Sequence, residues 1–305
     1  MFYAKFKKWI AGAELALAVV FAPILIAQGK KMIQVKGSDT MVNLVQILAE
    51  EYMAKNPKAA PIAVLGGGSG TGITALINGT CDIANHSRDF STKEFNQAWE
   101  RGVKPRVFAI AVDGLSIIVN EKNPLNQLAM DQVGAIYRGD VKNWRAVGGP
   151  AMPISLYGRQ SNSGTYAFLQ EHVLKNKNYS PDVKEMNGSA QIVEGVIADA
   201  AAIGYVGVGY VIDQATGKPL KGLKILNISK DEKSPAASPL DKDAVETGKY
   251  PIARALWQST NGKPGAEAAT FLQFELGPEG QKIVEREGFY SIGAKYIEAN
   301  MKNFK

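Results

Sequence analysis

The sequence predicts an α/β fold with a largely parallel sheet. Apolar runs of strand length alternate with helix-spaced apolar residues along most of the chain, which is the pattern of repeated strand–helix units. Three of the turns between a strand and a helix carry serine or threonine beside glycine, at residues 37–40, 68–72 and 161–165. The length of 305 residues, with 46% hydrophobic and 21% charged residues, indicates about two globular domains.

The first 27 residues have the organisation of a secretory signal peptide. A short start with three lysines precedes an apolar stretch at 10–27, and small residues stand at its exit. Leu25 occupies a position where a small residue is expected before the cleavage site, so a retained membrane anchor is the alternative. No cysteine lies near residue 28, which argues against a lipoprotein signal. We therefore expect a periplasmic or extracytoplasmic protein.

Charge and cysteine content narrow the function classes. The formal net charge is +6, and the basic residues are scattered rather than clustered, so we expect a small anionic ligand and no nucleic acid. The single cysteine, Cys81, cannot form an internal disulfide, which is compatible with export into a bacterial periplasm. Its apolar neighbours indicate a small buried hydrophobic residue.

The first part of the chain predicts three strand–turn–helix units. Ser38 or Asp39 is the expected N-cap of the first helix, and Ser91 caps the third. The expected strands are 32–36, 62–65 and 81–85, and the expected helices are 41–52, 73–77 and 92–101.

The rest of the chain predicts a second domain and a return to the first. A long β-type run at 107–120, broken at Asp113, passes from one domain to the next, and an extended stretch at 250–260 returns. Residues 221–228 and 231–243 are expected to be exposed surface. Further helices are expected at 131–137, 166–175, 191–200, 266–276 and 277–287, strands at 154–157 and 203–206, and a polar, partly helical end at 289–305.

The glycine-rich turn at residues 66–72 is the best candidate for ligand binding. Five glycines accompany Ser69 and Thr71 between a strand and a helix. Glycine lets a ligand approach the backbone closely, and the unpaired N–H groups at a helix start attract anions. We interpret this turn, including Gly70, as part of a cradle for a small oxyanion, with a purely structural turn as the alternative.

The other hydroxyl-bearing turns suggest a shared site. In open α/β sheets such turns lie at the carboxyl ends of strands, where ligands bind, and turns from two domains can face across a cleft. Arg159 can then hold two anion oxygens in a fork, and Arg88 can do the same after its own strand. Serine and threonine hydroxyls donate to the remaining oxygens. Ordinary helix capping is the alternative for each turn.

Competing motifs are weak or missing. Gly72 is followed by Ile73 rather than Lys, so a nucleotide-hydrolysing loop is not indicated. Residues 70–75 match a degenerate dinucleotide pattern with Asp89 at a suitable distance, but export and the other two turns argue against it. Two histidines without a partner do not predict a metal site, and neither a serine-hydrolase elbow nor a carboxylate pair is evident. We expect no catalytic residue, metal or cofactor.

Eight short motifs follow one another in a specific order from about residue 33 to residue 292. These are Gly37-Ser38-Asp39-Thr40, Gly67-Gly68-Ser69-Gly70, Asp82-Ile83-Ala84 with Ser87-Arg88, the Asp113-Gly114 run, Ile136-Tyr137-Arg138-Gly139 through Asn143-Trp144, Arg159 with Ser163-Gly164-Thr165, Ile203-Gly204-Tyr205, and Leu276-Gly277-Pro278-Glu279-Gly280. In this order the chain resembles the phosphate-binding proteins of bacterial phosphate ABC transporters, the PstS family.

The resemblance implies a type 2 periplasmic-binding-protein fold, with two α/β lobes joined by two crossing strands and a ligand cleft between them. Residues 28–112 and 247–305 are then lobe 1, and residues 113–246 are lobe 2. By the same match the residues that bind phosphate are Ser38, Thr40, Ser69, Ser87, Arg88, Arg159, Ser163, Gly164 and Thr165.

One departure from the family pattern concerns the phosphate proton. Some members have an aspartate where Ser87 and Arg88 stand here, and that aspartate accepts the proton. We hypothesise that Asp39 or Asp113 accepts it instead, with Asp113 preferred. The alternatives are that Asp39 caps its helix and that Asp113 anchors the hinge.

The resemblance implies an exported, non-enzymatic protein that captures inorganic phosphate and delivers it, as a monomer, to the membrane permease of an ABC transporter. The alternatives are a binder of sulfate or molybdate, an extracytoplasmic phosphomonoesterase, and a phosphate sensor or scavenger retained at the cell surface.

Overall fold

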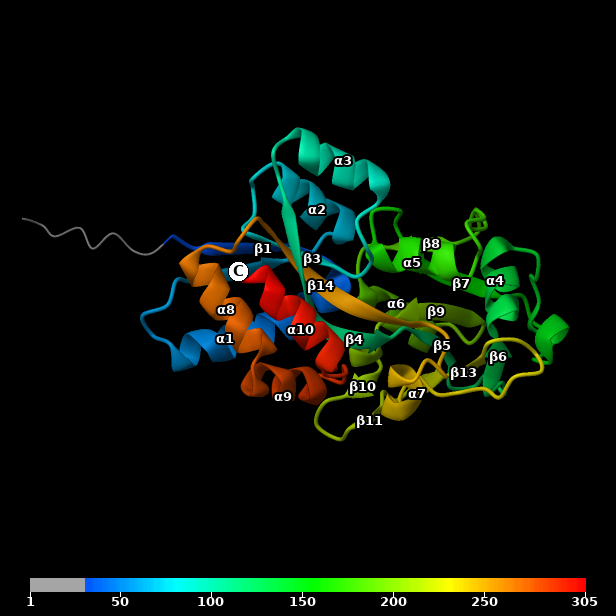
Figure 1. Cartoon of the computed structure of the whole chain (residues 1–305). Coiled ribbons are helices and arrows are strands. Elements are labelled where there is room, and N and C mark those ends of the chain that lie inside the picture. The colour runs from blue at the N-terminus through cyan, green and yellow to red at the C-terminus, as the bar shows by residue number, and fades with distance from the viewer. Residues whose placement is uncertain (1–30) are drawn as a thin grey trace, which may run out of the picture.

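The structure, a computed structural model, describes residues 31–305 and consists of two lobes, each built on a five-stranded sheet (Figure 1). The expected signal peptide at 1–27 lies outside the described residues. Among residues 31–305 no helix combines the length and the apolar character needed to cross a membrane.

Lobe 1 contains both ends of the described chain. Its sheet has the order β2-β1-β3-β14-β4, and β1 pairs in parallel with β2 and β3, so these three strands end at the same edge. The strands are β1 (Ile33–Gly37), β2 (Ile62–Leu65), β3 (Ile83–His86), β4 (Pro105–Gly114) and β14 (Ala253–Asn261). The helices are η1 (Asp39–Met41), α1 (Val42–Lys55), α2 (Ser69–Ile77), α3 (Thr92–Glu100), α8 (Ala266–Leu276), α9 (Pro278–Arg286) and α10 (Ala294–Asn303).

Lobe 2 is formed by the middle of the chain, and its sheet has the order β12-β5-β9-β7-β8. The sheet strands are β5 (Ser116–Asn120), β7 (Ser155–Arg159), β8 (Lys184–Met186), β9 (Ala202–Val206) and β12 (Leu223–Ile225). The helices are α4 (Met130–Arg138), η2 (Trp144–Val147), α5 (Gly164–His172), α6 (Ser189–Ala198), η3 (Val208–Tyr210) and α7 (Lys242–Glu246). Two small ladders complete the lobe, one of β6 (Gln127–Ala129) with β13 (Asn227–Ser229), the other of β10 (Ile212–Asp213) with β11 (Lys218–Pro219).

Two antiparallel segments connect the lobes. After β4 the chain passes through Leu115 into β5, and after α7 it returns through Ile252 into β14. Leu115 N donates to Ile252 O at 2.9 Å, which joins the two crossings directly. Figure 1 shows β14 and β4 running together from the lobe 1 sheet toward β5. The exact lobe boundaries at 112/113 and 246/247 stay a prediction.

In each five-stranded sheet four strands run in one direction and one runs against them, so the expectation of a largely parallel sheet is confirmed. The exceptions are crossing strands: β14 runs antiparallel to β3 and β4, and β5 runs antiparallel to β9 and β12. The stretch 221–228, expected at the surface, contains strands β12 and β13, and Leu226 and Ile228 are fully buried. Cys81 is buried, as predicted.

Candidate anion-binding site between the lobes

Three buried serines meet where the parallel strands of lobe 1 end. Ser38 follows β1, Ser69 begins α2 after β2, and Ser87 follows β3. Ser38 Oγ donates to Ser87 Oγ at 2.9 Å, and Ser87 N donates to Ser69 Oγ at 3.0 Å. Ser38 is the N-cap residue of η1, as predicted, but it makes no side-chain capping bond there, and its hydroxyl turns into this group instead.

Lobe 2 supplies the opposite side through the N-terminus of α5. Ser163 caps this helix, with its hydroxyl accepting from the backbone N–H groups of Thr165 and Tyr166. Thr165 Oγ1 lies 3.0 Å from Thr40 Oγ1 of lobe 1. Ser38, Thr40, Ser69, Ser87 and Thr165, hereafter the hydroxyl cluster, therefore join both lobes, and all five are buried.

Glycines bring the backbones close enough for this contact. Gly68, with φ of +91°, precedes α2, and Gly70 N of that helix donates to Asn162 O of lobe 2 at 3.0 Å. A Cβ placed on Gly164 would lie only 2.2 Å from Ser69 Oγ. Figure 1 shows α2 and α5 on facing sides of the lobes. Two nine-residue helices thus direct their N-termini at the cluster, and the positive ends of their dipoles favour an anion there.

Arg159 lies at the end of β7 and is buried. Its Nε donates to Met186 O at 3.1 Å, and its Nη2 donates to Asn187 O and to Asp39 Oδ2 of the other lobe. Among the described residues Nη1 makes no hydrogen bond, so two N–H groups remain available to an anion.

The first aspartate proposed to accept the phosphate proton pairs with this arginine. Asp39 Oδ1 accepts from Gly67 N at 2.8 Å while Oδ2 holds Arg159. Because its carboxylate accepts these bonds rather than one from η1, the helix-capping alternative for Asp39 is wrong. Its role as proton acceptor stays a prediction.

The second aspartate, Asp113, pairs with an arginine that the sequence analysis missed. Asp113 is fully buried, with Oδ1 accepting from Val208 N at 2.8 Å and Oδ2 accepting from Arg254 Nε at 3.0 Å. Burial lowers the pKa of the Arg254 guanidinium from its ordinary value, and the charge of Asp113 opposes that shift. Arg254 Nη2 also reaches the cluster, at 3.0 Å from Thr165 Oγ1. The role of Asp113 toward the phosphate proton likewise stays a prediction.

Arg88, the other arginine expected to hold the anion, is engaged by an acidic neighbour. Its two terminal nitrogens each donate to Glu94 at 2.7 Å, and Glu94 also closes the capping box with Ser91, as predicted for that helix start. Burial raises the pKa of Glu94, but the hydrogen bonds from Arg88 and Ser91 lower it by more, so the pKa lies below its ordinary value. The role of Arg88 toward the anion stays a prediction.

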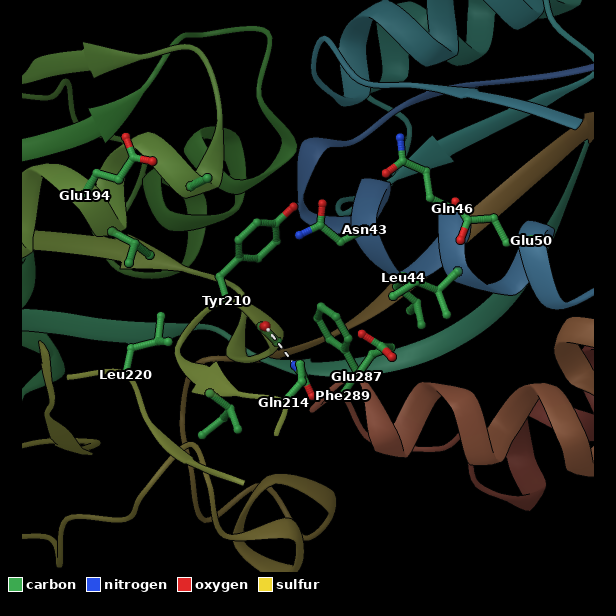
Figure 2. Close-up of a pocket in the computed structure, with 15 residues that line it drawn as sticks. Asn43, Leu44, Gln46, Glu50, Glu194, Tyr210, Gln214, Leu220, Glu287 and Phe289 are labelled. Atoms are coloured by element: carbon green, nitrogen blue, oxygen red, sulfur yellow. Dashed lines mark hydrogen bonds between the residues drawn. The ribbon is translucent and has the colours of Figure 1, made fainter. Parts of the chain in front are cut away.

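A separate cavity of about 510 Å³ lies between α1 and α6 (Figure 2). Glu50, Glu194 and Glu287 are the ionisable carboxylates in its lining, and no lysine or arginine contributes to it. Such a lining disfavours an anion. Figure 2 shows Tyr210, which lines this cavity, pointing toward Asn43; its hydroxyl donates to Asp39 O. Anion binding is therefore better supported at the hydroxyl cluster.

Further contacts at the site had only weak signals in the sequence. Asn162 stands within the third hydroxyl-bearing turn, and its Nδ2 donates to Gly67 O across the lobes at 2.9 Å. Arg254 interrupts an apolar strand, which was the only sign of its role. Among residues 31–305, no group of three histidine, cysteine or acidic side chains is placed to hold a metal ion.

Comparison with known proteins identifies the family. The model of the PBP superfamily domain matches residues 26–279. Phosphate-binding protein PstS of Pseudomonas aeruginosa is 34% identical over 284 residues, covering 87% of this chain and 84% of that protein. A structure described as a phosphate ABC transporter substrate-binding protein with bound phosphate, from Clostridium perfringens, has a TM-score of 0.75 at 25% identity and covers 86% of this chain and 100% of its own. An ABC-type phosphate transport receptor from Vibrio cholerae has a TM-score of 0.67 at 25% identity, with 85% and 100% covered. The chain is therefore a member of the PstS family of phosphate-binding proteins, within the PBP superfamily.

Proposed function

We propose that this chain captures inorganic phosphate at the hydroxyl cluster and delivers it to the membrane permease of an ABC transporter. The family consists of non-enzymatic transport receptors found in the periplasm or outside the cytoplasm. Export by a cleaved signal peptide at 1–27, without lipid attachment, and a monomeric state belong to the same proposal.

The observation that carries the proposal is the meeting of donors from both lobes. The N-termini of α2 and α5 meet at the hydroxyl cluster. Arg159, which has two N–H groups without a partner among the described residues, pairs with Asp39, the residue before Thr40 of that cluster. Tetrahedral oxyanions present several acceptors in different directions, and donors placed around them replace the lost water. Closure of the lobes on the anion would then shift the protein toward the form that a permease recognises.

The site residues predicted from the sequence keep their place in this proposal. The hydroxyls and N–H groups would contact the phosphate oxygens, Gly70 and Gly164 would allow close backbone approach, and the carboxylate of Asp39 or Asp113 would accept the phosphate proton. These residues are Ser38, Asp39, Thr40, Ser69, Gly70, Ser87, Arg88, Asp113, Arg159, Ser163, Gly164 and Thr165.

Calorimetric titration of the purified protein with phosphate and with sulfate tests the proposal. We expect saturable 1:1 binding of phosphate and much weaker binding of sulfate. A phosphate concentration a hundredfold above Kd should stabilise the fold by about 2.7 kcal/mol. No heat and no rise in melting temperature with millimolar phosphate, in protein freed of carried-over anion, would refute the proposal. Tighter binding of sulfate would reassign the ligand.

A further inference from the structure

Arg254 occupies a special position in the connection between the lobes. It lies on β14 directly opposite Asp113 of β4 in the antiparallel ladder. Its Nε and Nη2 both donate to Asp113 Oδ2, at 3.0 and 2.9 Å, while Val208 N donates to the other carboxylate oxygen. Both side chains are buried, at 3% and 0% exposure. The pair therefore has a fixed place and direction.

The guanidinium also contacts both lobes. Nη1 donates to Ser87 O at 3.0 Å, and Nη2 donates to Thr40 Oγ1 at 3.4 Å, both in lobe 1. In lobe 2, Nη2 donates to Thr165 Oγ1 at 3.0 Å, and the guanidinium carbon lies 5.2 Å from the centre of the Phe168 ring. The threonines are two of the predicted phosphate contacts.

A hydroxyl oxygen that accepts from a guanidinium cannot direct its own hydrogen at that guanidinium. Each threonine has one hydroxyl hydrogen and two lone pairs. Thr40 and Thr165 share one hydrogen bond at 3.0 Å, so the donor of that bond uses its hydrogen and the other hydroxyl keeps one. Nη2 has two hydrogens and directs one at Asp113 Oδ2, so the two threonine oxygens share the other. An oxyanion beside the pair can accept the hydroxyl hydrogen that the threonines do not use between themselves, and it can accept both hydrogens once the bond between the threonines is given up.

We infer that Arg254, held by Asp113, is a positioning residue that directs the Thr40 and Thr165 hydroxyls, one from each lobe, to donate to the bound anion. This inference rests on the proposed function, since it concerns how the same site binds phosphate. It assigns Asp113 to the support of Arg254.

The first test measures phosphate affinity by calorimetry in Arg254→Lys. Lysine keeps the charge beside Asp113 but lacks the planar guanidinium, whose Nη2 reaches both threonines. We expect the phosphate affinity to fall about tenfold or more. Asp113→Asn/Arg254→Gln removes both charges together, so that neither remains buried without its partner, and we expect a similar loss. Melting curves and binding stoichiometry give the folded fraction of each variant.

A double-mutant cycle separates positioning from general support of the fold. If Arg254 acts through Thr165, the double variant Arg254→Lys/Thr165→Val should bind phosphate nearly as well as whichever of the two single variants binds it more weakly. The reason is that both changes remove the same donor. The matched control is Ser38→Ala, since among the described residues the Ser38 hydroxyl bonds Ser87 Oγ and makes no hydrogen bond with Arg254, Thr40 or Thr165. The fold-loss in phosphate affinity caused by this control change should multiply with the fold-loss caused by Arg254→Lys.

The outcomes distinguish the two proposals. Wild-type protein that does not bind phosphate refutes the proposed function, and this inference with it. Wild-type protein that binds phosphate while both Arg254 variants bind within twofold of it refutes this inference alone. If the losses of phosphate affinity in Arg254→Lys and Thr165→Val multiply in the double variant, the inference is also refuted, and the role of Arg254 is to support the fold.

Discussion

At the scale of single residues, the site combines two buried arginines with two aspartates. Arg159 pairs with Asp39 across the lobes, and Arg254 pairs with Asp113 across the crossing strands. Each pair is close to neutral, and a buried charge without a partner would be strongly unfavourable. An anion at this site would therefore be bound mainly through N–H and O–H donors, and the selectivity of the site would depend on where its acceptors and donors point.

Asp39→Asn tests whether Asp39 accepts the phosphate proton. Phosphate near neutral pH has a P–OH group and sulfate has none, so a carboxylate acceptor favours phosphate, and sites built around one hydrogen bond can discriminate strongly. We expect this variant to weaken phosphate binding more than sulfate binding, so that calorimetry gives Kd values for the two anions that lie closer together. An equal loss for both anions would show that Asp39 only holds Arg159.

Glu275 makes a separate prediction about pH and stability. It is fully buried, and burial raises its pKa well above the ordinary 4.5, although a 3.1 Å hydrogen bond from Gln258 opposes this. Gln258 Oε1 and Glu275 Oε2 have no hydrogen-bond partner within residues 31–305, and a protonated carboxyl provides the missing donor.

The folded protein thus binds the Glu275 proton more tightly than the unfolded chain does. The resulting stability is fully present below pH 4.5 and is lost as the pH rises from 4.5 toward the raised folded value, by up to about 1.4 kcal/mol per pH unit. We expect Glu275→Gln to flatten this decline in urea unfolding at several pH values and to stabilise the protein at pH 7. Glu298→Gln, on the exposed face of α10, is the control. An unchanged pH profile in Glu275→Gln would contradict the argument.

At the scale of elements, the start of α5 determines how closely the lobes meet. Gly164→Ala would place a Cβ at 2.2 Å from Ser69 Oγ and 2.6 Å from Ser87 Oγ, so the lobes must separate to accept it. We expect calorimetry to show phosphate affinity reduced by about tenfold or more, with the fold retained. Gly188→Ala, before α6, is the matched control because a Cβ there meets nothing within 4 Å. Affinity within twofold of wild type in Gly164→Ala would show that the lobes tolerate the methyl group.

The elements show what local sequence can and cannot predict. The β1–α1, β2–α2, β3–α3 and β7–α5 units were predictable because apolar periodicity and capping residues are local signals. The glycine-rich turn was predicted to extend to residue 72, but α2 already begins at Ser69. Strands β12 and β13 were missed because their burial depends on partners β5 and β6 far earlier in the chain.

The candidate site was predictable in part for the same reason. Hydroxyls and glycines next to helix starts are visible in sequence, and the family resemblance ordered them. The partners of the ionic side chains are not visible in the sequence, because their pairing depends on sheet register, on local folding and on contact between the lobes. Arg254 meets Asp113 only through the β14–β4 ladder, and Arg88 is engaged by Glu94 only through the fold of α3.

At the scale of the whole molecule, binding and closure share their contacts. Beyond the hydroxyl cluster, Gly70 N donates to Asn162 O, Asn162 Nδ2 donates to Gly67 O, and Tyr210 Oη donates to Asp39 O, each from one lobe to the other. Such bonds exist only while the lobes meet. They contribute to the affinity for any anion that is enclosed, and do not by themselves select among anions.

Tyr210→Phe tests this separation of closure from selectivity. The Tyr210 hydroxyl bonds the backbone carbonyl of Asp39 outside the hydroxyl cluster, so its removal deletes one interlobe bond and leaves the donors around the anion in place. We expect calorimetry to show that the affinities for phosphate and sulfate fall by the same factor, roughly two- to tenfold, so that the ratio of the two Kd values is unchanged. Tyr52→Phe is the matched control, because its hydroxyl bonds Thr270 within lobe 1 at 2.8 Å, and it should leave both affinities unaltered. A changed phosphate-to-sulfate ratio in Tyr210→Phe would mean that closure itself selects the anion, and equal binding by wild type and variant would mean that this contact does not contribute to closure.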